Sequence, residues 1–397
     1  MAALGFLSYF TGVKTLFFVL AFCLITNQLT AQGTLKGRTT GLLPFLEYGV
    51  GEDRLGGAKM NFLDSNIAVR VTDSFNNKYK VQLSKYHSAY LLKENFAPDT
   101  SLWIRSYYLT DSWKVFGDEK YDYVTVGLED KLPYKSFQEI NPSRIIVDIF
   151  GVASNTNWIA QLSTAKEIKN AYYQQVEDDV FRVIIELNHP QHWGYSIYYE
   201  GNKLVIRVKQ QPADLSFSKL KIAVDAGHGG DNEGETGGRS GIIEKNYTLR
   251  IAKELQDVLQ NEGATVFMTR EKDTTLPMPD RVLMLRQEQP DLLISIHLNS
   301  SGNEADKGAS TYYRYIGFRP LSQFILKRML ELNLDEYGNI GNFNFGLNGP
   351  SDYPNCLVEV AFLSNRGDEA KIRDAGFRRS VAVKISAGIK DWLDSLK

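Results

Sequence analysis

The feature that most constrains this 397-residue chain is a change of pattern near residue 210. Before it, apolar and polar residues alternate in short runs, and the pair Asn76-Asn77 separates two of these runs as in a β-hairpin. After it, short apolar runs alternate with helical patterns whose apolar residues recur every three or four positions. This order predicts a β-rich N-terminal region, followed by an α/β region with a mostly parallel sheet and helices on both faces.

The C-terminal region has the clearer pattern. Lys221–Asp225 is expected as a strand and Lys245–Glu262 as a helix, which Gly263 ends in a C-cap position. Further strands are expected over 264–269, 291–296, 311–315 and 356–362, and further helices over 280–289, 320–335 and 377–396. In such sheets ligands bind beyond the carboxyl ends of the strands, so residues that follow a strand are the first candidates for a site.

Domain boundaries follow from breaks in these patterns. Pro212 lies in a segment that fits neither pattern, and we predict a linker over 210–219. In the N-terminal region, only 164–172 shows helical periodicity. The expected organisation is a leader over 1–32, two β modules over 33–100 and 101–209, the linker, and the α/β domain over 220–397.

The first 32 residues have the pattern of a signal peptide. Lys14 precedes a short apolar run, and polar residues then lead to a cleavage position expected near Ala31 or Gln32. The alternative is a retained membrane anchor, but Asn27 and Gln28 leave the run short for a full span. We therefore expect an exported protein, periplasmic, extracellular or wall-associated, with no stable membrane anchor after cleavage.

Composition limits which partners and covalent bonds are expected. The net charge of −2 gives no global electrostatic case for nucleic acid. Cleavage would leave Cys356 as the remaining cysteine, which excludes an intramolecular disulfide. Because Cys356 begins an apolar run, it is expected to be a buried, inert thiol.

Four ionisable residues of the C-terminal region lie at the edges of apolar runs or within them. His228 follows the first predicted strand, His297 follows the run 292–296, and Glu244 opens a helix. Each of these alone has a structural explanation, as a strand-end or helix-start residue. Glu359 interrupts the run 356–362, where an unpaired carboxylate would be costly. Two His and one Glu are a typical ligand set for catalytic zinc, and a second Glu nearby suits a general base.

Six segments carry a resemblance to a known family, in the order in which the family has them. They are VDAGHGG (224–230), EKN with IAKEL (244–255), MTR with a following Asp (268–273), ISIHLN (294–299), GASTYY (308–313) and LVEVAFLSN (357–365). Residues 221–397 thereby resemble the zinc-dependent N-acetylmuramoyl-L-alanine amidases of the amidase type 3 family. The resemblance implies hydrolysis of the amide between N-acetylmuramic acid and L-alanine in peptidoglycan, in wall remodelling or daughter-cell separation.

The resemblance also implies roles for the four residues. His228, Glu244 and His297 would bind one Zn²⁺ per catalytic domain, and Glu359 would be the catalytic glutamate. Asn299 is a candidate for contacting substrate, with a turn role as the equal alternative. Arg270, Arg281 and the histidines outside this set are expected to be structural: His87, His189 and His192.

Two departures from the family qualify these implications. The loop over 229–243 is acidic and lacks the family's usual Gly-Ala pattern, which puts its substrate contacts in doubt. The segment over 315–347 has room for about one helix, whereas division-associated relatives carry a long helical insertion that blocks the zinc. We therefore expect no built-in plug, although a protein activator is a possible partner besides peptidoglycan.

The N-terminal modules resemble wall-targeting domains only in strand pattern and position. Residues 33–100 resemble a bacterial SH3-like module, and 101–209 resemble an AMIN-type β domain. The alternative is a purely structural β region. For the whole chain, the alternatives to an amidase are a zinc peptidase that cuts within the stem peptide and a non-catalytic wall-binding protein. A decayed enzyme would be expected to lose part of the four-residue set, which is complete here.

Overall fold

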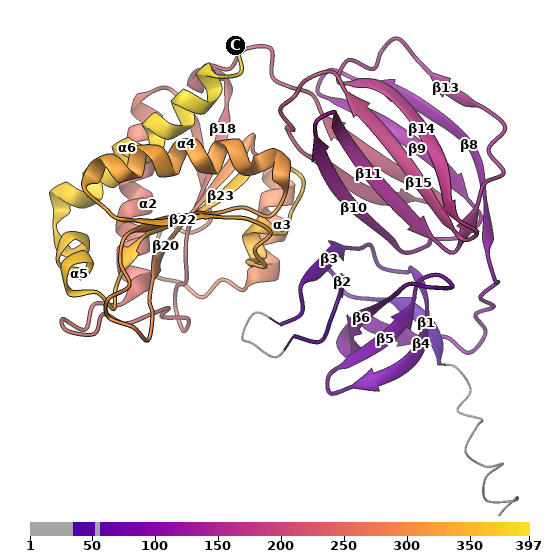
Figure 1. The fold of residues 1–397 in the computed structure, drawn as a ribbon, viewed down its shortest axis with the longest axis horizontal. Coiled ribbons are helices and arrows are strands. Elements are labelled where there is room, and N and C mark those ends of the chain that lie inside the picture. The colour runs from indigo at the N-terminus through magenta and orange to yellow at the C-terminus, as the bar shows by residue number, and fades with distance from the viewer. Residues whose placement is uncertain (1–34, 52–55) are drawn as a thin grey trace, which may run out of the picture.

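The computed structural model describes residues 35–51 and 56–397, so the predicted signal peptide lies outside the described residues. Figure 1 shows an α/β body on the left, a β-sandwich on the right and a small β module below them. None of the described helices combines the length and apolar character needed to cross a bilayer.

The small module is a seven-stranded antiparallel sheet in the order β3-β2-β6-β5-β4-β1-β7. Its hairpin joins β4 and β5 at Asn76, whose positive φ of 44° suits a tight turn, as the Asn76-Asn77 pair predicted. Its strands are β1 (Lys36–Thr39), β2 (Phe45–Glu47), β3 (Lys59–Phe62), β4 (Ala68–Phe75), β5 (Lys78–Gln82), β6 (Ser88–Leu92) and β7 (Phe96–Pro98).

The sandwich packs two sheets face to face around a core that includes Trp113 and Phe181. One sheet has the order β10-β11-β15-β14, and the other has β12-β8-β9-β17-β16 with β13 beside β8. The strands are β8 (Tyr108–Gly117), β9 (Tyr121–Leu128), β10 (Tyr134–Ile140), β11 (Ser143–Phe150), β12 (Val152–Ala153), β13 (Ile159–Gln161), β14 (Ile168–Glu177), β15 (Val180–Leu187), β16 (Tyr195–Glu200) and β17 (Lys203–Lys209).

The helical periodicity over 164–172 does not correspond to a helix, because Ile168 begins strand β14. A register irregularity between Ile168 and Asn170 interrupts the strand alternation. As a result, the buried side chains Ile168 and Ala171 are three positions apart, which is the spacing of a helix.

The α/β body has a six-stranded sheet in the order β19-β18-β20-β23-β21-β22. All neighbouring strands in it run parallel except β21 and β23. Strand β22 was not predicted, and the helix expected over 320–335 ends earlier, since Asn333 adopts a left-handed conformation. The strands are β18 (Lys221–Ala226), β19 (Thr265–Met268), β20 (Leu292–Asn299), β21 (Ala309–Tyr312), β22 (Glu336–Ile340) and β23 (Asn355–Phe362).

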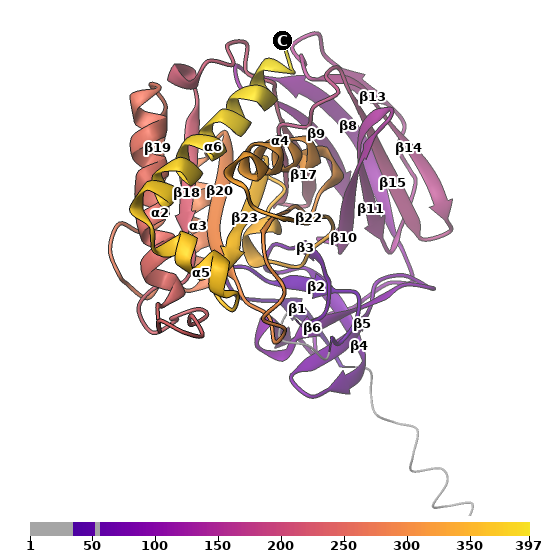
Figure 2. The ribbon, with the colours of Figure 1, turned by 60° about the vertical axis from the view of Figure 1, so that its left-hand side comes forward.

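Helices cover both faces of this sheet (Figure 2). Three of them, α2, α4 and α6, share one large apolar core with the sheet, whereas α3 covers the other face with a small cluster around Leu285 and Leu293. The helices are α2 (Glu244–Asn261), α3 (Met278–Glu288), α4 (Arg319–Met329), α5 (Arg366–Arg373) and α6 (Ala375–Asp394).

Polar contacts fix the sandwich to the α/β body. Gln191 of the sandwich bonds the α/β body twice: its Nε2 donates to the Gly317 carbonyl at 2.7 Å, and its Oε1 accepts from Trp392 Nε1 at 3.1 Å. Trp392 also packs on Trp193 with ring centroids 5.2 Å apart. The two parts are therefore joined through buried side chains as well as through the linker.

Candidate metal centre

Three ligand-type side chains converge at the carboxyl ends of β18 and β20. His228, Glu244 and His297 each offer one ligand atom, and these atoms lie within 4.8 Å of one another. His228 Nε2 lies 3.0 Å from Glu244 Oε2, and His297 Nδ1 lies 3.1 Å from Glu244 Oε1. His228 follows its strand as expected, whereas His297 lies inside β20, which continues to Asn299.

Glycine shapes the loop around these side chains. His228 itself has a left-handed backbone with φ of 62°, a conformation that a non-glycine residue adopts at a cost and that is common at functional sites. A side chain at Gly227 would collide with the His297 ring, and one at Gly234 would collide with the Glu244 carboxylate. The loop therefore lies directly against the three ligand-type residues.

Two buried arginines hold the backbone of the His228 loop. Arg270 donates to the carbonyls of Ala226 at 2.9 Å and Gly227 at 2.8 Å, and Arg281 donates to the His228 carbonyl at 2.5 Å. The structural roles predicted for both arginines are confirmed.

Beneath the loop, Asp225 anchors Arg281 in a buried ion pair and accepts hydrogen bonds from Thr269 at 2.6 Å and Ser295 at 2.7 Å. Burial raises the pKa of Asp225, but the Arg281 charge and these bonds hold it below its usual value. Asp225 is therefore a carboxylate that positions the loop from below, a role that sequence analysis missed.

The electrostatics of the three residues favour a cation. Burial raises the pKa of Glu244, but the hydrogen bonds and charges of the two histidines lower it well below its usual range. Burial lowers the pKa of His228, and its bonds to Glu244 and Asn232 raise it above the usual value. Glu244 is thus a buried carboxylate kept in its charged form by the two histidines, and it also accepts from the backbone N–H groups of Glu235 at 2.8 Å and Leu298 at 3.0 Å.

The donor set fits zinc. Two His and one Glu are a typical ligand set for zinc, and one ligand atom from each lies within 4.8 Å of the other two. Asn232 Oδ1 lies 2.8 Å from His228 Nδ1, the kind of outer hydrogen bond that orients a ligand ring and leaves Nε2 for the metal. Asn232 lies in the acidic loop that departs from the family pattern, and sequence analysis did not single it out.

Glu359 lies on β23, the strand next to β20. Its Cα is the register partner of His297, so the two side chains emerge on the same face of the sheet. Only 7% of Glu359 is exposed, as its apolar neighbours predicted. Asn299 ends β20, where its Oδ1 accepts from the Ser300 backbone at 2.8 Å.

An aromatic group beside His297 was not predicted. The Phe345 ring is parallel to that of His297 at a centroid distance of 6.4 Å, and Phe343 and Tyr312 pack on Phe345 at 4.5 and 5.3 Å. Both phenylalanines belong to the loop between β22 and β23. Residue type alone did not mark them, because aromatic residues are more often core residues.

The remaining histidines lie outside the group of metal-type residues and make contacts of their own. His87 and His189 pair with Glu177 at 2.8 Å and Glu167 at 2.6 Å. His192 is buried at the junction with the α/β body, and its Nε2 lies 2.9 Å from the Glu139 carbonyl.

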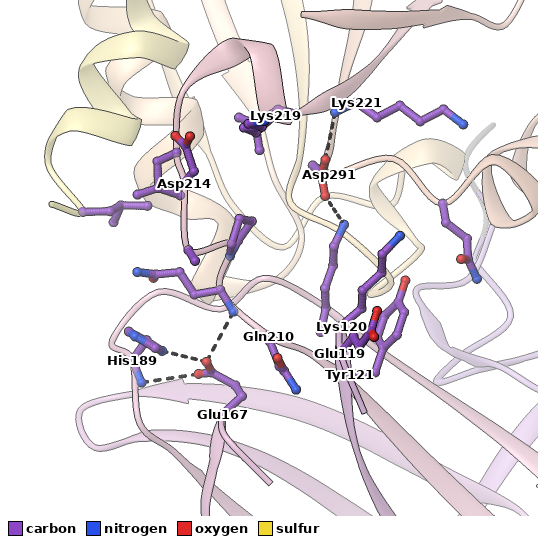
Figure 3. Close-up of a pocket in the computed structure, with 18 of the residues that line it drawn as sticks. Glu119, Lys120, Tyr121, Glu167, His189, Gln210, Asp214, Lys219, Lys221 and Asp291 are labelled. Carbon is purple, nitrogen blue, oxygen red and sulfur yellow. Dashed lines mark hydrogen bonds and ion pairs between the residues drawn. The ribbon is translucent and has the colours of Figure 1, made fainter. Parts of the chain in front are cut away.

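A large cavity lies away from this centre. It measures about 1240 Å³ and surrounds the linker, where Lys221 and Asp291 mark the amino ends of β18 and β20 (Figure 3). Lys209 pairs with Asp291 at 2.7 Å, and the Glu167–His189 pair lies on the sandwich side. The residues His228, Glu244 and His297 lie at the opposite ends of the same strands. This cavity therefore lies at the junction between the sandwich and the α/β body, away from them.

Comparison with known proteins agrees with the geometry. Residues 222–391 match the family model described as N-acetylmuramoyl-L-alanine amidase, and residues 114–208 match the AMIN domain. AmiC of Escherichia coli is 24% identical over 368 residues, covering 70% of this chain and 88% of the relative. Among solved structures, the catalytic domain of CwlV from Bacillus (Paenibacillus) polymyxa aligns at 31% identity with a TM-score of 0.43, covering 45% of this chain and 99% of that one.

The match to a third protein establishes the family. The germination-specific N-acetylmuramoyl-L-alanine amidase of Bacillus subtilis is 32% identical over 198 residues, which cover 45% of this chain and 82% of the relative. The metal-type residues all lie within the stretch that matches the family model. This chain belongs to the N-acetylmuramoyl-L-alanine amidase family.

Proposed function

We propose that this amidase hydrolyses the bond between N-acetylmuramic acid and L-alanine in peptidoglycan at one zinc ion held by His228, Glu244 and His297, with Glu359 as general base. The observation that carries the proposal is the convergence of three ligand atoms within 4.8 Å, beside a strand that brings Glu359 into register with His297. The family membership supplies the bond that is cut.

Bound zinc supplies a Lewis acid that polarises the scissile carbonyl and lowers the pKa of a water molecule to about 7. Glu359 takes a proton from the attacking water and passes it to the alanine nitrogen as the carbon–nitrogen bond breaks. Its burial in β23 shields the carboxylate from bulk solvent. Asn299, at the end of β20, is the candidate for contacting the substrate.

The proposal includes export to the cell wall. The AMIN match over 114–208 and the likeness to AmiC support a periplasmic or wall-associated location. The predicted signal peptide over 1–32 and the SH3-like assignment of 33–100 belong to this proposal as well. Residues 1–32 would be removed, and the two β modules would hold the enzyme on its polymeric substrate.

The test is digestion of purified peptidoglycan by the mature protein, with and without chelator, followed by identification of the new amino termini. We expect release of peptides that begin with L-alanine, and loss of that release when the metal is removed. New termini within the stem would instead establish a peptidase. No release by zinc-loaded protein, from wall or from soluble fragments, would contradict an autonomous enzyme.

A further inference from the structure

A second cavity lies where all three parts of the molecule meet, close to the proposed metal centre. It measures about 380 Å³ and lies between β3, the sandwich and the loop after β22. Side chains from each part line it: Tyr48 and Lys59, Phe137 and Gln138, Arg314 and Phe343.

Among the described residues, no carboxylate pairs with the two cations of this cavity. Within residues 35–51 and 56–397, neither Lys59 nor Arg314 has a carboxylate at ion-pair distance. The nearby acid Glu47 is already paired with Lys78. Burial lowers the pKa of Lys59, and the Arg314 charge lowers it further, as two cations that share a confined space should.

Gln138 Nε2 is a third donor at this cavity, with no acceptor in the part of the chain that the structure describes. Gln138 is 7% exposed, and its Oε1 accepts from the Gly317 backbone at 2.8 Å. Its Nε2 is buried with no hydrogen-bond partner among the described residues. A buried amide nitrogen without an acceptor is costly, unless a ligand supplies one.

The cavity lies next to the proposed metal centre along a row of neighbouring aromatic rings. Phe343 lines it and lies 4.5 Å from Phe345, which in turn lies 6.4 Å from His297. The loop is fixed from the other side, because Asn344 accepts from the Lys59 backbone at 3.1 Å and donates to the Gly57 carbonyl at 2.8 Å. A ligand that extends a few residues from the metal centre would reach the cavity.

We propose that this three-part cavity binds a carboxylate of the stem peptide, through Lys59, Arg314 and Gln138 Nε2. The inference rests on the proposed function, in which the stem is the leaving group beyond the scissile amide. A stem peptide bears carboxylates on its acidic residues and at its C-terminus, and cationic and amide donors are suited to such groups. Tyr48 and Phe343 supply apolar surface for the rest of the peptide.

The test compares soluble muropeptides with free carboxylates and with one carboxylate amidated, either at the internal acidic residue or at the C-terminus. We expect one of the two amidations to raise KM about fivefold in the wild-type enzyme, a typical worth of a half-exposed charge contact. Lys59→Gln should remove this discrimination, Lys59→Arg should retain it, and kcat should change little in either variant.

Lys80→Gln is the matched control, because Lys80 lies in the same module, is half-buried like Lys59 and does not line the cavity. It should discriminate between the muropeptides like the wild type. Equal discrimination by wild type and Lys59→Gln, or none by the wild type, would overturn the carboxylate subsite while leaving the amidase intact.

If the wild type cleaves none of the muropeptides, calorimetry with the free stem peptide separates the two claims. Binding that Lys59→Gln weakens would support the cavity and reject only the catalytic proposal. Binding that the substitution leaves unchanged would overturn the cavity.

Discussion

Among the described residues, the buried glutamates Glu244 and Glu167 both pair with histidine, and only Glu244 belongs to the proposed metal centre. Glu244 lies between His228 and His297 at 3.0 and 3.1 Å, and Glu167 pairs with His189 at 2.6 Å. Burial opposes ionisation of both, yet the pKa of Glu244 is lowered and that of Glu167 is raised. The difference is the second histidine, so a His–Glu pair alone is no evidence of a metal site.

The surroundings of Glu244 and Glu167 also differ. Glu244 faces a glycine-rich loop with a left-handed His228, at the carboxyl ends of parallel strands. Glu167 accepts from the Gln211 backbone at 3.4 Å and thereby fastens the linker to the sandwich (Figure 3). The left-handed backbone of His228 and a third ligand-type side chain distinguish the proposed metal centre from the Glu167–His189 pair, which only holds the linker.

The largest expected effect separates catalytic from structural carboxylates. Glu359→Gln should lower kcat about a thousandfold, because the water proton loses its acceptor. Zinc content, measured by mass spectrometry on the purified protein, should stay near one per chain. Glu167→Gln is the matched control, as another buried Glu→Gln change, and should leave kcat within about twofold. Full activity of Glu359→Gln would remove this residue from the proton transfers.

The next largest effect is expected on the affinity for zinc. Glu244→Ala should weaken zinc binding by at least about 100-fold, since even outer partners of metal ligands contribute 10- to 100-fold. His189→Ala should leave the affinity unchanged, because its partner Glu167 lies beside the linker. Competition with a chromogenic chelator measures both. Equal losses in the two variants would break the distinction between the two glutamates.

The smallest effect concerns the pH dependence of stability and involves His192, which lies three residues after His189. Burial lowers the pKa of His192 to about 4, from 6.5 in the unfolded chain, and a bond to the Glu139 carbonyl only partly offsets this. Between these values the unfolded chain binds more protons, so the contribution of His192 to stability is complete above pH 6.5. It declines as the pH falls and has lost about 3 kcal/mol below pH 4.

Urea unfolding at pH 7 and pH 4.5 measures this decline. His192→Gln should flatten it, whereas His87→Gln, which changes a half-buried histidine, should leave it in place. An unchanged slope in His192→Gln would show that other groups set the acid sensitivity.

The candidate site was predictable because its residues interrupt strong local patterns. Glu359 stands out in an apolar strand, and His228 and Glu244 stand at the ends of a strand and a helix. The sheet order and the extension of β20 past His297 depend on pairing between distant strands, which local periodicity does not encode. The bulge at Ile168 produced a false helical spacing for the same reason.

Most of the features that the sequence did not predict are contacts between modules. Nothing near Lys59 or Asn344 indicates that the two residues are hydrogen-bonded, and no pattern marks Phe345 as a neighbour of His297. Asn232 was hidden among the polar residues of its loop. These roles are set by three-dimensional neighbours that a single sequence does not reveal.

The bonds of Asn344 to Gly57 and Lys59 join positions 287 and 285 residues apart. The N-terminal module supplies one side of this contact early in synthesis, and the loop that it holds is made near the end. Contacts of such long range form only once most of the chain is present. The wall beside His297 is therefore among the last parts of the molecule to be completed, and a nascent or truncated chain would have its ligand residues before it had a finished substrate cleft.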